Sequence, residues 1–366
     1  MQNVASVLTD QFSDLLKRLP AGLDLDRLAL ETKAIQRKRE LGDGASLLRI
    51  ALARGPGGLS LRQTAAWASL LGIANLSNPA VKYRLDRADD FLAAVLERLL
   101  AAKAPGAELR WPGRTLHLAD GTCVSKPGSK GTDWRVHGVF DLGRGGFSHL
   151  ELTDKHGAEA LARGAPLAGE IRIGDRNYAR APVLQRFLAD SGGKADFIVR
   201  VGWNALQLRT PAGRPFDLIG YLQCLPNDTK PHEVNLRAAA GRGEPTVAVR
   251  LIVLRKTPEA AAATRLALRR AAIKKGKKLD PRSLIAAEFM ILATSLPRPG
   301  YSAKAVLAVY RLRWQIELAF KRLKSLLHID RLPTRTEPGS RSWLQAHLIL
   351  ALLCDDLSQD FLESSP

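Results

Sequence analysis

The chain contains few cysteines and no long hydrophobic run. Its three cysteines, Cys123, Cys224 and Cys354, are scattered over 366 residues. Such a set argues against a disulfide framework, shows no metal-ligand spacing and favours a reducing compartment. The longest apolar run, around Leu344 to Cys354, is about half a membrane span and contains His347, so it predicts a buried helix. Because MQNVASVLTDQFSDLL lacks the pattern of a signal peptide, we expect a cytoplasmic protein.

Acidic residues are also in deficit. The chain has 36 Asp and Glu against 55 Lys and Arg, which gives a formal net charge of +19 and a pI near 10.2. A field of this sign attracts polyanions, of which nucleic acid is the commonest, although a basic enzyme without a nucleic-acid partner is the alternative. The seven histidines show no ligand spacing, which disfavours a zinc hydrolase.

Residues 1–104 have helical periodicity and form a predicted N-terminal all-α domain. Ser60 is the expected cap of a helix that ends at Gly72, and a second helix starts near Pro79. Two helices joined by a short turn resemble a DNA-binding helix-turn-helix, although any two packed helices share this pattern. The candidate phosphate contacts are Lys82, Arg84 and Arg87.

From 105 to 203 the pattern changes to alternating strands. TLHLADGT reads as a strand ending at Asp120, and RVHGVFDL and FSHLELTD flank a glycine-rich hairpin turn. A short helical piece is expected over 158–164, and the strand EIRIG leads to Asp175. The helix VLQRFLADSG and the strand ADFIVRVG follow. This order predicts an α/β fold with the mixed sheet of a ribonuclease-H-like core, lacking only its last helix.

Residues 204–296 interrupt that core with a predicted β-rich insertion. FDLIGYLQCL, TVAVRLIVLR and EFMILATSL read as β-like, and a basic helical run between 265 and 282 includes Lys274 and Lys275. The like charges of this run repel one another at helical spacing, and a polyanion would relieve the repulsion. We therefore expect DNA contact there, with a solvated surface helix as the alternative.

The missing core helix is expected at 297–328, where Ser302 caps SAKAVLAVYRLRWQIELAFKRLKSLL. At about 100° per residue, four side chains fall within an arc of roughly 60°. They are Tyr310, Arg313, Glu317 and Lys324. The apolar stripe lies about 85° away and buries the helix. Its members are Ala305, Val309, Leu312, Ile316, Phe320, Leu323 and Leu327. A simple surface ion pair between Arg313 and Glu317 is the alternative, but it leaves Tyr310 and Lys324 unexplained.

The spacing Tyr310-x2-Arg313-x3-Glu317-x6-Lys324 resembles the YREK signature of the insertion-sequence 4 family of bacterial DDE transposases. Asp120 in LADGT and Asp175 in GDRNYA match two further blocks in the right order. SLRQTAAWASLLGI and DWRVHGVFDL also look like family segments, so the resemblance extends from about residue 45 to 327.

The resemblance implies that Asp120, Asp175 and Glu317 are catalytic and bind two Mg²⁺ (or Mn²⁺) ions. Hard divalent cations select carboxylate oxygens, and two ions can serve the attacking and leaving oxygens of a phosphodiester. It also implies DNA-end contacts from a second set of side chains. These are Tyr310, Arg313 and Lys324, with Tyr178 on the same surface and Arg200 pointing in from the fifth strand, unless solvated. Trp203 and Trp314 are candidates for base stacking, although core packing is the simpler reading of Trp314.

The function implied is a DNA transposase that cleaves double-stranded DNA at terminal inverted repeats, through a hairpin, and joins the 3′ ends to target DNA. Two ends must meet, so we expect a homodimer in the synaptic complex. Residues 329–366 form a short helical C-terminal segment with little room for a dimerisation domain. The alternatives are a metal-dependent ribonuclease-H-like nuclease without strand transfer and a transposase-derived DNA-binding repressor.

Overall fold

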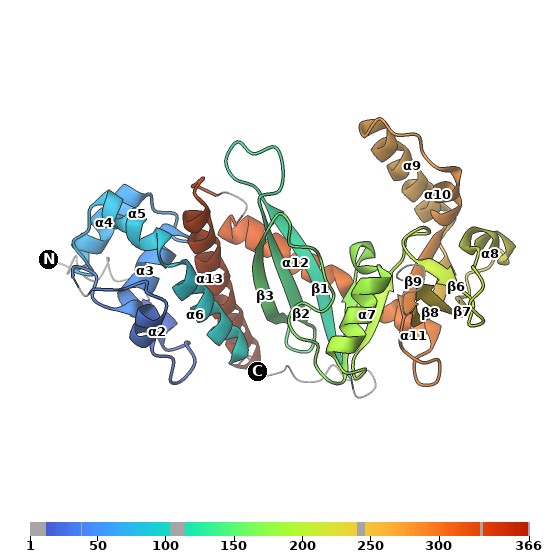
Figure 1. The fold of residues 1–366 in the computed structure, drawn as a ribbon, viewed down its shortest axis with the longest axis horizontal. Coiled ribbons are helices and arrows are strands. Elements are labelled where there is room, and N and C mark those ends of the chain that lie inside the picture. The colour runs from blue at the N-terminus through green and yellow to red at the C-terminus, as the bar shows by residue number, and fades with distance from the viewer. Residues whose placement is uncertain (1–11, 38, 103–113, 240–245, 330–331, 365–366) are drawn as a thin grey trace.

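A computed structural model describes residues 12–37, 39–102, 114–239, 246–329 and 332–364. It shows an elongated α/β protein with a group of helices at one end and a mixed sheet in the middle (Figure 1). At the other end, two helices project away from the sheet (Figure 1). No helix in the described ranges is long and apolar enough to cross a membrane.

The described chain before the sheet is helical. Its helices are α1 (Phe12–Leu16), α2 (Leu25–Glu31), α3 (Gly44–Arg54), α4 (Leu61–Leu70), α5 (Asn78–Asp86) and α6 (Asp89–Ala101). A reciprocal capping box between Ser60 and Gln63 starts α4, and Gly72, with a φ of 64°, follows its end. Ser77 caps α5, and Pro79 lies in its first turn. The helix boundaries predicted from Ser60, Gly72 and Pro79 are therefore confirmed.

The last helix, α13 (Glu337–Ser364), returns to the N-terminal helices. It packs against α3, α5 and α6, and it also contacts α12 and β3. The Ser342 hydroxyl donates to the Leu85 carbonyl at 2.7 Å, and Arg341 Nε donates to Asp89 at 2.6 Å. Leu344 is fully buried, as predicted for this apolar run. Helices from both ends of the chain thus share one core beside the sheet.

The sheet has nine strands in the order β3-β2-β1-β4-β5-β9-β8-β7-β6. They are β1 (Thr115–Val124), β2 (Trp134–Asp141), β3 (Gly146–Asp154), β4 (Glu170–Gly174), β5 (Asp196–Arg200), β6 (Gln207–Arg209), β7 (His232–Ala239), β8 (Thr246–Arg255) and β9 (Phe289–Thr294). β4 pairs in parallel with β1 and β5, and the other neighbours are antiparallel. The strands in residues 204–296 extend the same sheet, because β9 pairs with β5.

The remaining helical elements are η2 (Arg176–Tyr178), α7 (Ala181–Asp190), α8 (Leu218–Cys224), α9 (Pro258–Lys274), α10 (Pro281–Ala286), α11 (Ala303–Tyr310), η3 (Arg311–Arg313) and α12 (Trp314–Leu327). α7 follows its predicted range. The basic run forms α9 and α10, and Gly276, with a φ of 60°, lies between them. Figure 1 shows this pair projecting from the end of the sheet formed by β6–β9.

Two local predictions are wrong. Residues 158–164 form no helix, because the buried guanidinium of Arg172 takes the carbonyl oxygens of Leu161, Arg163 and Gly164. FDLIGYLQCL forms α8 rather than a strand. Asp217 accepts a hydrogen bond from Gly220 N and caps the helix, and the two buried leucines in it, Leu218 and Leu222, are four residues apart.

The predicted uninterrupted helix from Ser302 is also wrong at one place. Ser302 caps α11, but a 3₁₀ turn at Arg311–Arg313 separates α11 from α12. The tighter turn shifts the phase between the two helices, so Tyr310 is buried with α11, whereas Glu317 on α12 is exposed. Beyond the turn, the apolar stripe of Ile316, Phe320 and Leu323 is buried as predicted.

Gly138 on β2 allows α12 to approach the sheet. A Cβ atom at this position would lie 2.8 Å from the Phe147 ring and 2.9 Å from the Phe320 ring. These two rings pack on each other with centroids 5.4 Å apart. Gly138 is also the cross-strand partner of Asp120 on β1. The contact therefore sets the position of α12 relative to Asp120.

We expect Gly138→Ala to lower the free energy of unfolding by about 1–3 kcal/mol, because the added methyl overpacks two rings. Urea unfolding of the two proteins measures the difference. Gly131→Ala is the matched control, since nothing lies within 4 Å of a Cβ atom there. Adding Phe320→Leu to Gly138→Ala should restore part of the loss, and equal effects of the two alanine variants would contradict this packing.

Candidate active site

Asp120 and Asp175 lie at the same edge of the sheet. The parallel pairing of β1 with β4 ends at Leu118 and Ile173, and each aspartate is two residues beyond that pair. Strand β1 does not end at Asp120, as the sequence suggested, but continues to Val124 because β2 still pairs with it. Asp175 directly follows β4, and its Oδ1 accepts a 2.8 Å hydrogen bond from Asn177 N, which starts η2. The two carboxylates are therefore level on adjacent strands.

Glu317 comes to the same edge from α12. It is one helical turn before Phe320, which packs over Gly138 beside Asp120. Asp120 and Glu317 line one groove of about 600 Å³. The other lining residues are Gly121, Thr122, Phe320, Lys321, Lys324, Ser325 and His328. The groove thus has Asp120 on its β1 wall and Glu317, Lys321 and Lys324 on its α12 wall.

Arg313 lies between these acids. Its Nη2 donates to Glu317 Oε1, and its Nη1 is 3.9 Å from Asp120 Oδ2. The Arg313 side chain is 19% exposed, whereas that of Glu317 is 53% exposed. The ion pair considered as the simpler reading of the sequence is therefore present. With Glu317 turned toward Arg313, the described residues contain no group of three or more His, Cys, Asp or Glu side chains placed to hold a metal ion.

The pKa of Asp120 is raised to about 6, chiefly by burial and also by the negative charges of Asp175 and Glu317, against the opposing effects of Gly121 N–H and Arg313. When Asp120 ionises, it adds a negative charge beside two other acids, and this repulsion disfavours its ionised form. The region around Asp120 is thus an acidic site in a protein whose formal net charge is +19.

The predicted DNA contacts occupy different environments. Lys324 lines the groove, as predicted for a side chain near Glu317. Arg200 is level with Asp175, because Gly174 pairs with Val199. Tyr310 and Tyr178 are buried, and the exposed positions expected for them are wrong. Only 7% of Tyr310 and 2% of Tyr178 are exposed, and burial raises the pKa of both phenols.

The burial of Tyr178 has a local cause. The turn η2 that follows Asp175 folds the Tyr178 ring back under β4, where a Cβ atom on Gly174 would lie 2.9 Å from it. Tyr178 is therefore not part of an exposed surface. Lys274 and Lys275 are exposed at the end of α9, in the projecting pair of helices and outside the groove.

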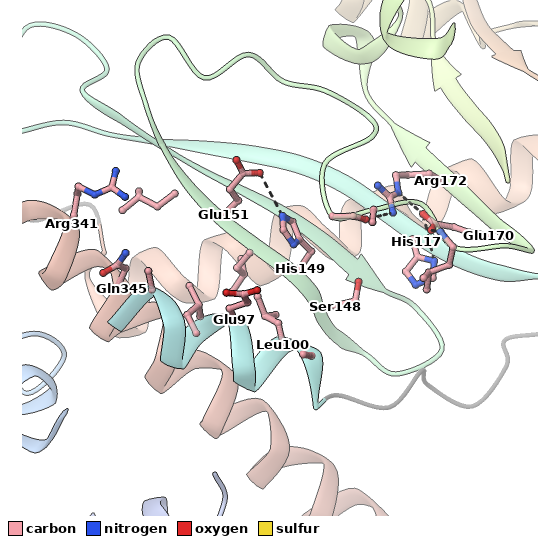
Figure 2. Close-up of a pocket in the computed structure, with 18 residues that line it drawn as sticks. Glu97, Leu100, His117, Ser148, His149, Glu151, Glu170, Arg172, Arg341 and Gln345 are labelled. Atoms are coloured by element: carbon pink, nitrogen blue, oxygen red, sulfur yellow. Dashed lines mark hydrogen bonds and ion pairs between the residues drawn. The ribbon is translucent and has the colours of Figure 1, made fainter. Parts of the chain in front are cut away.

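A second cavity of about 490 Å³ lies against α6 and the edge strand β3 (Figure 2). Its charged walls are paired internally: Arg172 with Glu170, and Arg163 with Glu151. None of the three predicted acids lines it. The groove beside Asp120 is therefore the better candidate for chemistry on a polyanion.

Sequence reasoning overlooked several cations near the acids. Lys321 lines the groove, and Arg176 directly follows Asp175. Lys256 follows β8, and burial, together with the positive charges of Arg200 and Arg176, lowers its pKa to about 8. The only sequence signal for Lys256 was its place directly after a strand, in a segment interpreted as a separate insertion.

Comparison with known proteins identifies the family. Residues 111–353 match the family described as the transposase DDE domain. The chain is 40% identical over 360 residues to InsL of insertion sequence element IS186A from Escherichia coli K12, and the match covers 98% of this chain and 96% of that protein. The chain belongs to the DDE transposase family. The resemblance to insertion-sequence 4 transposases is thereby confirmed, and the protein is a DNA transposase.

Two further similarities accompany these. The transposase for insertion sequence element IS421 of Escherichia coli is 40% identical over 361 residues, with 98% of this chain and 96% of that one covered. Among solved structures, the piggyBac transposase synaptic complex with hairpin DNA aligns with a TM-score of 0.47 and 10% identity, over 97% of this chain and 74% of that chain.

We expect Asp120→Asn to stabilise the transposase in the absence of metal and DNA. The pKa of Asp120 is about 6 when folded and 3.8 as the ordinary value, so ionisation destabilises the fold as pH rises from about 4 to 6, and fully above 6. The gain should be about 1–3 kcal/mol at pH 7.5 and close to zero at pH 3.5.

Thermal unfolding in EDTA at the two pH values measures this gain. Asp190→Asn is the control, because that carboxylate is exposed and paired only with Arg186. If Asp120→Asn changed stability equally at both pH values, ionisation of Asp120 would not be the cause of the destabilisation.

Proposed function

We propose that this transposase cleaves DNA at the terminal inverted repeats of an insertion sequence and joins the 3′ ends to target DNA, with Asp120, Asp175 and Glu317 as its metal-binding acids. The observation that carries the proposal is the level placement of Asp120 and Asp175 on adjacent strands, with Glu317 on the helix packed beside them. Release of the element through a DNA hairpin follows from the family resemblance.

Strand order supports a ribonuclease-H-like core for this site. β3-β2-β1-β4-β5 has a central parallel trio flanked by an antiparallel hairpin, and α12 covers it. In that reading, β6–β9 with α8–α10 are inserted in sequence between β5 and the final core helix. The insertion would lengthen the sheet and carry α9 outward.

The residues suit two Mg²⁺ (or Mn²⁺) ions. All three side chains offer hard oxygen donors, and the raised pKa of Asp120 indicates a position where a cation relieves repulsion. Bound ions would neutralise the acids and polarise the scissile phosphate. Glu317 would have to release Arg313 to take part. The guanidinium so freed suits a bidentate contact with a phosphate oxygen pair, and Lys324 suits a point-charge contact.

Substituting any of the three acids should abolish cleavage and joining. We expect Asp120→Asn, Asp175→Asn and Glu317→Gln each to lower the rate of end cleavage by at least roughly a thousandfold, because each removes a metal oxygen donor. Binding of terminal-repeat DNA should change by less than about threefold. Gel assays of cleavage and of strand transfer from pre-cleaved ends, with Mg²⁺ and with Mn²⁺, measure these rates.

Asp190→Asn serves again as the control and should retain normal rates. Wild-type cleavage without any joining would indicate a nuclease. Binding without either activity, with or without metal, would indicate a repressor. Full activity in one of the three variants would remove that residue from the site.

The helices α4 and α5 are proposed to bind the terminal repeats. Arg84 and Arg87 lie on the same helix as Lys82, which pairs with Asp86, and Arg87 stacks over the Tyr83 ring at 5.3 Å. Lys82 and Arg87 are exposed and Arg84 is half-buried, whereas Val81 and Leu85 on the same helix are buried. A cationic helix face beside a capped turn fits the DNA backbone.

Replacing both Arg84 and Arg87 with alanine should weaken terminal-repeat binding about tenfold or more, and it should lower the slope of log affinity against log salt by about 2. Fluorescence anisotropy at several salt concentrations measures both quantities. Arg98→Ala on α6, also exposed, should leave the slope unchanged. An unchanged slope in the double variant would place the repeat elsewhere on the protein.

Further partners follow from the reaction. Two ends must be held together, so we propose a homodimer in the synaptic complex, acting on DNA in the bacterial cytoplasm. Lys274 and Lys275 on the projecting helix α9 are proposed to contact DNA outside the groove, because repulsion among the exposed cations of that helix favours a polyanion.

A further inference from the structure

Three cations extend the edge of the sheet beyond Asp175. Arg176 follows Asp175 on the turn η2, and Arg200 is level with Asp175 at the end of β5. β8 runs in the same direction as β5, because both are antiparallel to β9 between them, and Lys256 directly follows β8. Along this edge of the sheet, acids therefore follow β1 and β4, and bases lie at the ends of β5 and β8.

These cations differ from their neighbours in their ion pairs. None of the ion pairs in the described part of the chain includes Arg176, Arg200 or Lys256. The neighbouring Arg255 and Arg265 differ, because both pair with Glu288. Glu288 thus neutralises Arg255 and Arg265, whereas the negative charge that acts on Arg200 is that of Asp175, one of the three acids proposed to bind metal.

Lys256 and Arg200 are also partly buried. Lys256 Nζ donates to the Thr264 hydroxyl at 3.0 Å and to the Ala287 carbonyl at 2.7 Å, both neutral acceptors. No hydrogen bond between described side chains uses the Arg200 guanidinium. Burial lowers the pKa of Arg200, and burial together with Arg200 and Arg176 lowers the pKa of Lys256 to about 8. Partly buried like charges are costly unless an anion joins them.

A phosphate from DNA would suit these groups. It supplies the missing negative charge, and its oxygens accept from a guanidinium fork and from an ammonium group. The groove that contains Glu317 and Lys324 lies on the β1 side of the acids, whereas these cations lie on the β5 and β8 side. The two sides therefore occupy different positions along the edge of the sheet.

We propose that Arg176, Arg200 and Lys256 form a second phosphate-binding site, which holds a DNA phosphodiester other than the scissile one. This inference rests on the proposed function of the three acids. The phosphodiester belongs either to the transposon end or to the target DNA, and the recognising chemistry is the same for both. Occupying both sites would fix the DNA path across the acids.

The test pairs protein variants with single uncharged phosphates in the DNA. Arg200→Gln and Lys256→Gln in the full-length protein are compared with Arg214→Gln, which removes one exposed cation beside β6. Methylphosphonate replaces one phosphate at a time near the cleavage position of a terminal-repeat duplex, and in a separate series near the joining position of a target duplex. Binding of the end duplex and strand transfer from pre-cleaved ends into the target are measured.

We expect Arg200→Gln and Lys256→Gln each to lower one of these two quantities by roughly tenfold. One particular methylphosphonate should lower the same quantity in the wild type and in Arg214→Gln, but add no further loss in the two variants. The series in which that position appears identifies the DNA. Lys256→Arg should recover most of the loss and should again respond to that methylphosphonate. If Lys256 only held the Ala287 carbonyl, no response to a single phosphate would be expected.

If both variants matched Arg214→Gln in both series, with melting temperatures like the wild type, the second site would be refuted. If Lys256→Gln failed to fold, Arg200→Gln and Lys256→Arg would still decide the question. Failure of the proposed function has a different signature, namely a wild type that neither cleaves nor joins. In that case the end-binding series would still show whether these cations contact a phosphate.

Discussion

The packing of Phe320 over Gly138 is the contact on which the active-site geometry depends. Gly138 is the cross-strand partner of Asp120, and Phe320 is one turn beyond Glu317. A missing side chain on β2 therefore allows the helix that carries the third acid to approach the strand that carries the first. Asp175 needs no such device, because the parallel register of β1 and β4 already places it beside Asp120.

Acids and bases lie close together around this contact. Burial and the negative charges of Asp175 and Glu317 raise the pKa of Asp120, while the surrounding protein is strongly basic. Without metal or DNA, Arg313 partly neutralises the acids, because it pairs with Glu317 and lies 3.9 Å from Asp120. On the other side of Asp175, no ion pair among the described residues includes Arg176 or Arg200. The described ion pairs that involve the acids therefore lie on the Arg313 side and not on the Arg200 side.

Much of this arrangement could be predicted from sequence, because local sequence patterns determine where the strands and helices begin. Alternating strands and the family motifs located Asp120, Asp175 and Glu317, and the capping residues Ser60 and Ser302 marked real helix starts. The three acids themselves remain a prediction of function, which their shared edge supports but does not test.

The failures have physical causes that local patterns do not contain. No glycine or proline marks the 3₁₀ turn at Arg311–Arg313, so a uniform 100° rotation misplaced Tyr310 on an exposed face. Tyr178 is buried because the turn after Asp175 folds its ring under Gly174. Lys256 was overlooked because it reaches the site only when β8 and β9 join the same sheet as β5.

The 3₁₀ turn also constrains how this segment can change in length. Tyr310 and Phe320 are both buried, and one residue inserted or deleted between Tyr310 and Glu317 would rotate Glu317 and Phe320 together by about 100° relative to Tyr310. Substitutions can alter individual contacts in this stretch, but an altered length would turn the third acid away from the other two. The number of residues from Tyr310 to Phe320 therefore fixes the orientation of Glu317, whichever residues occupy the positions between them.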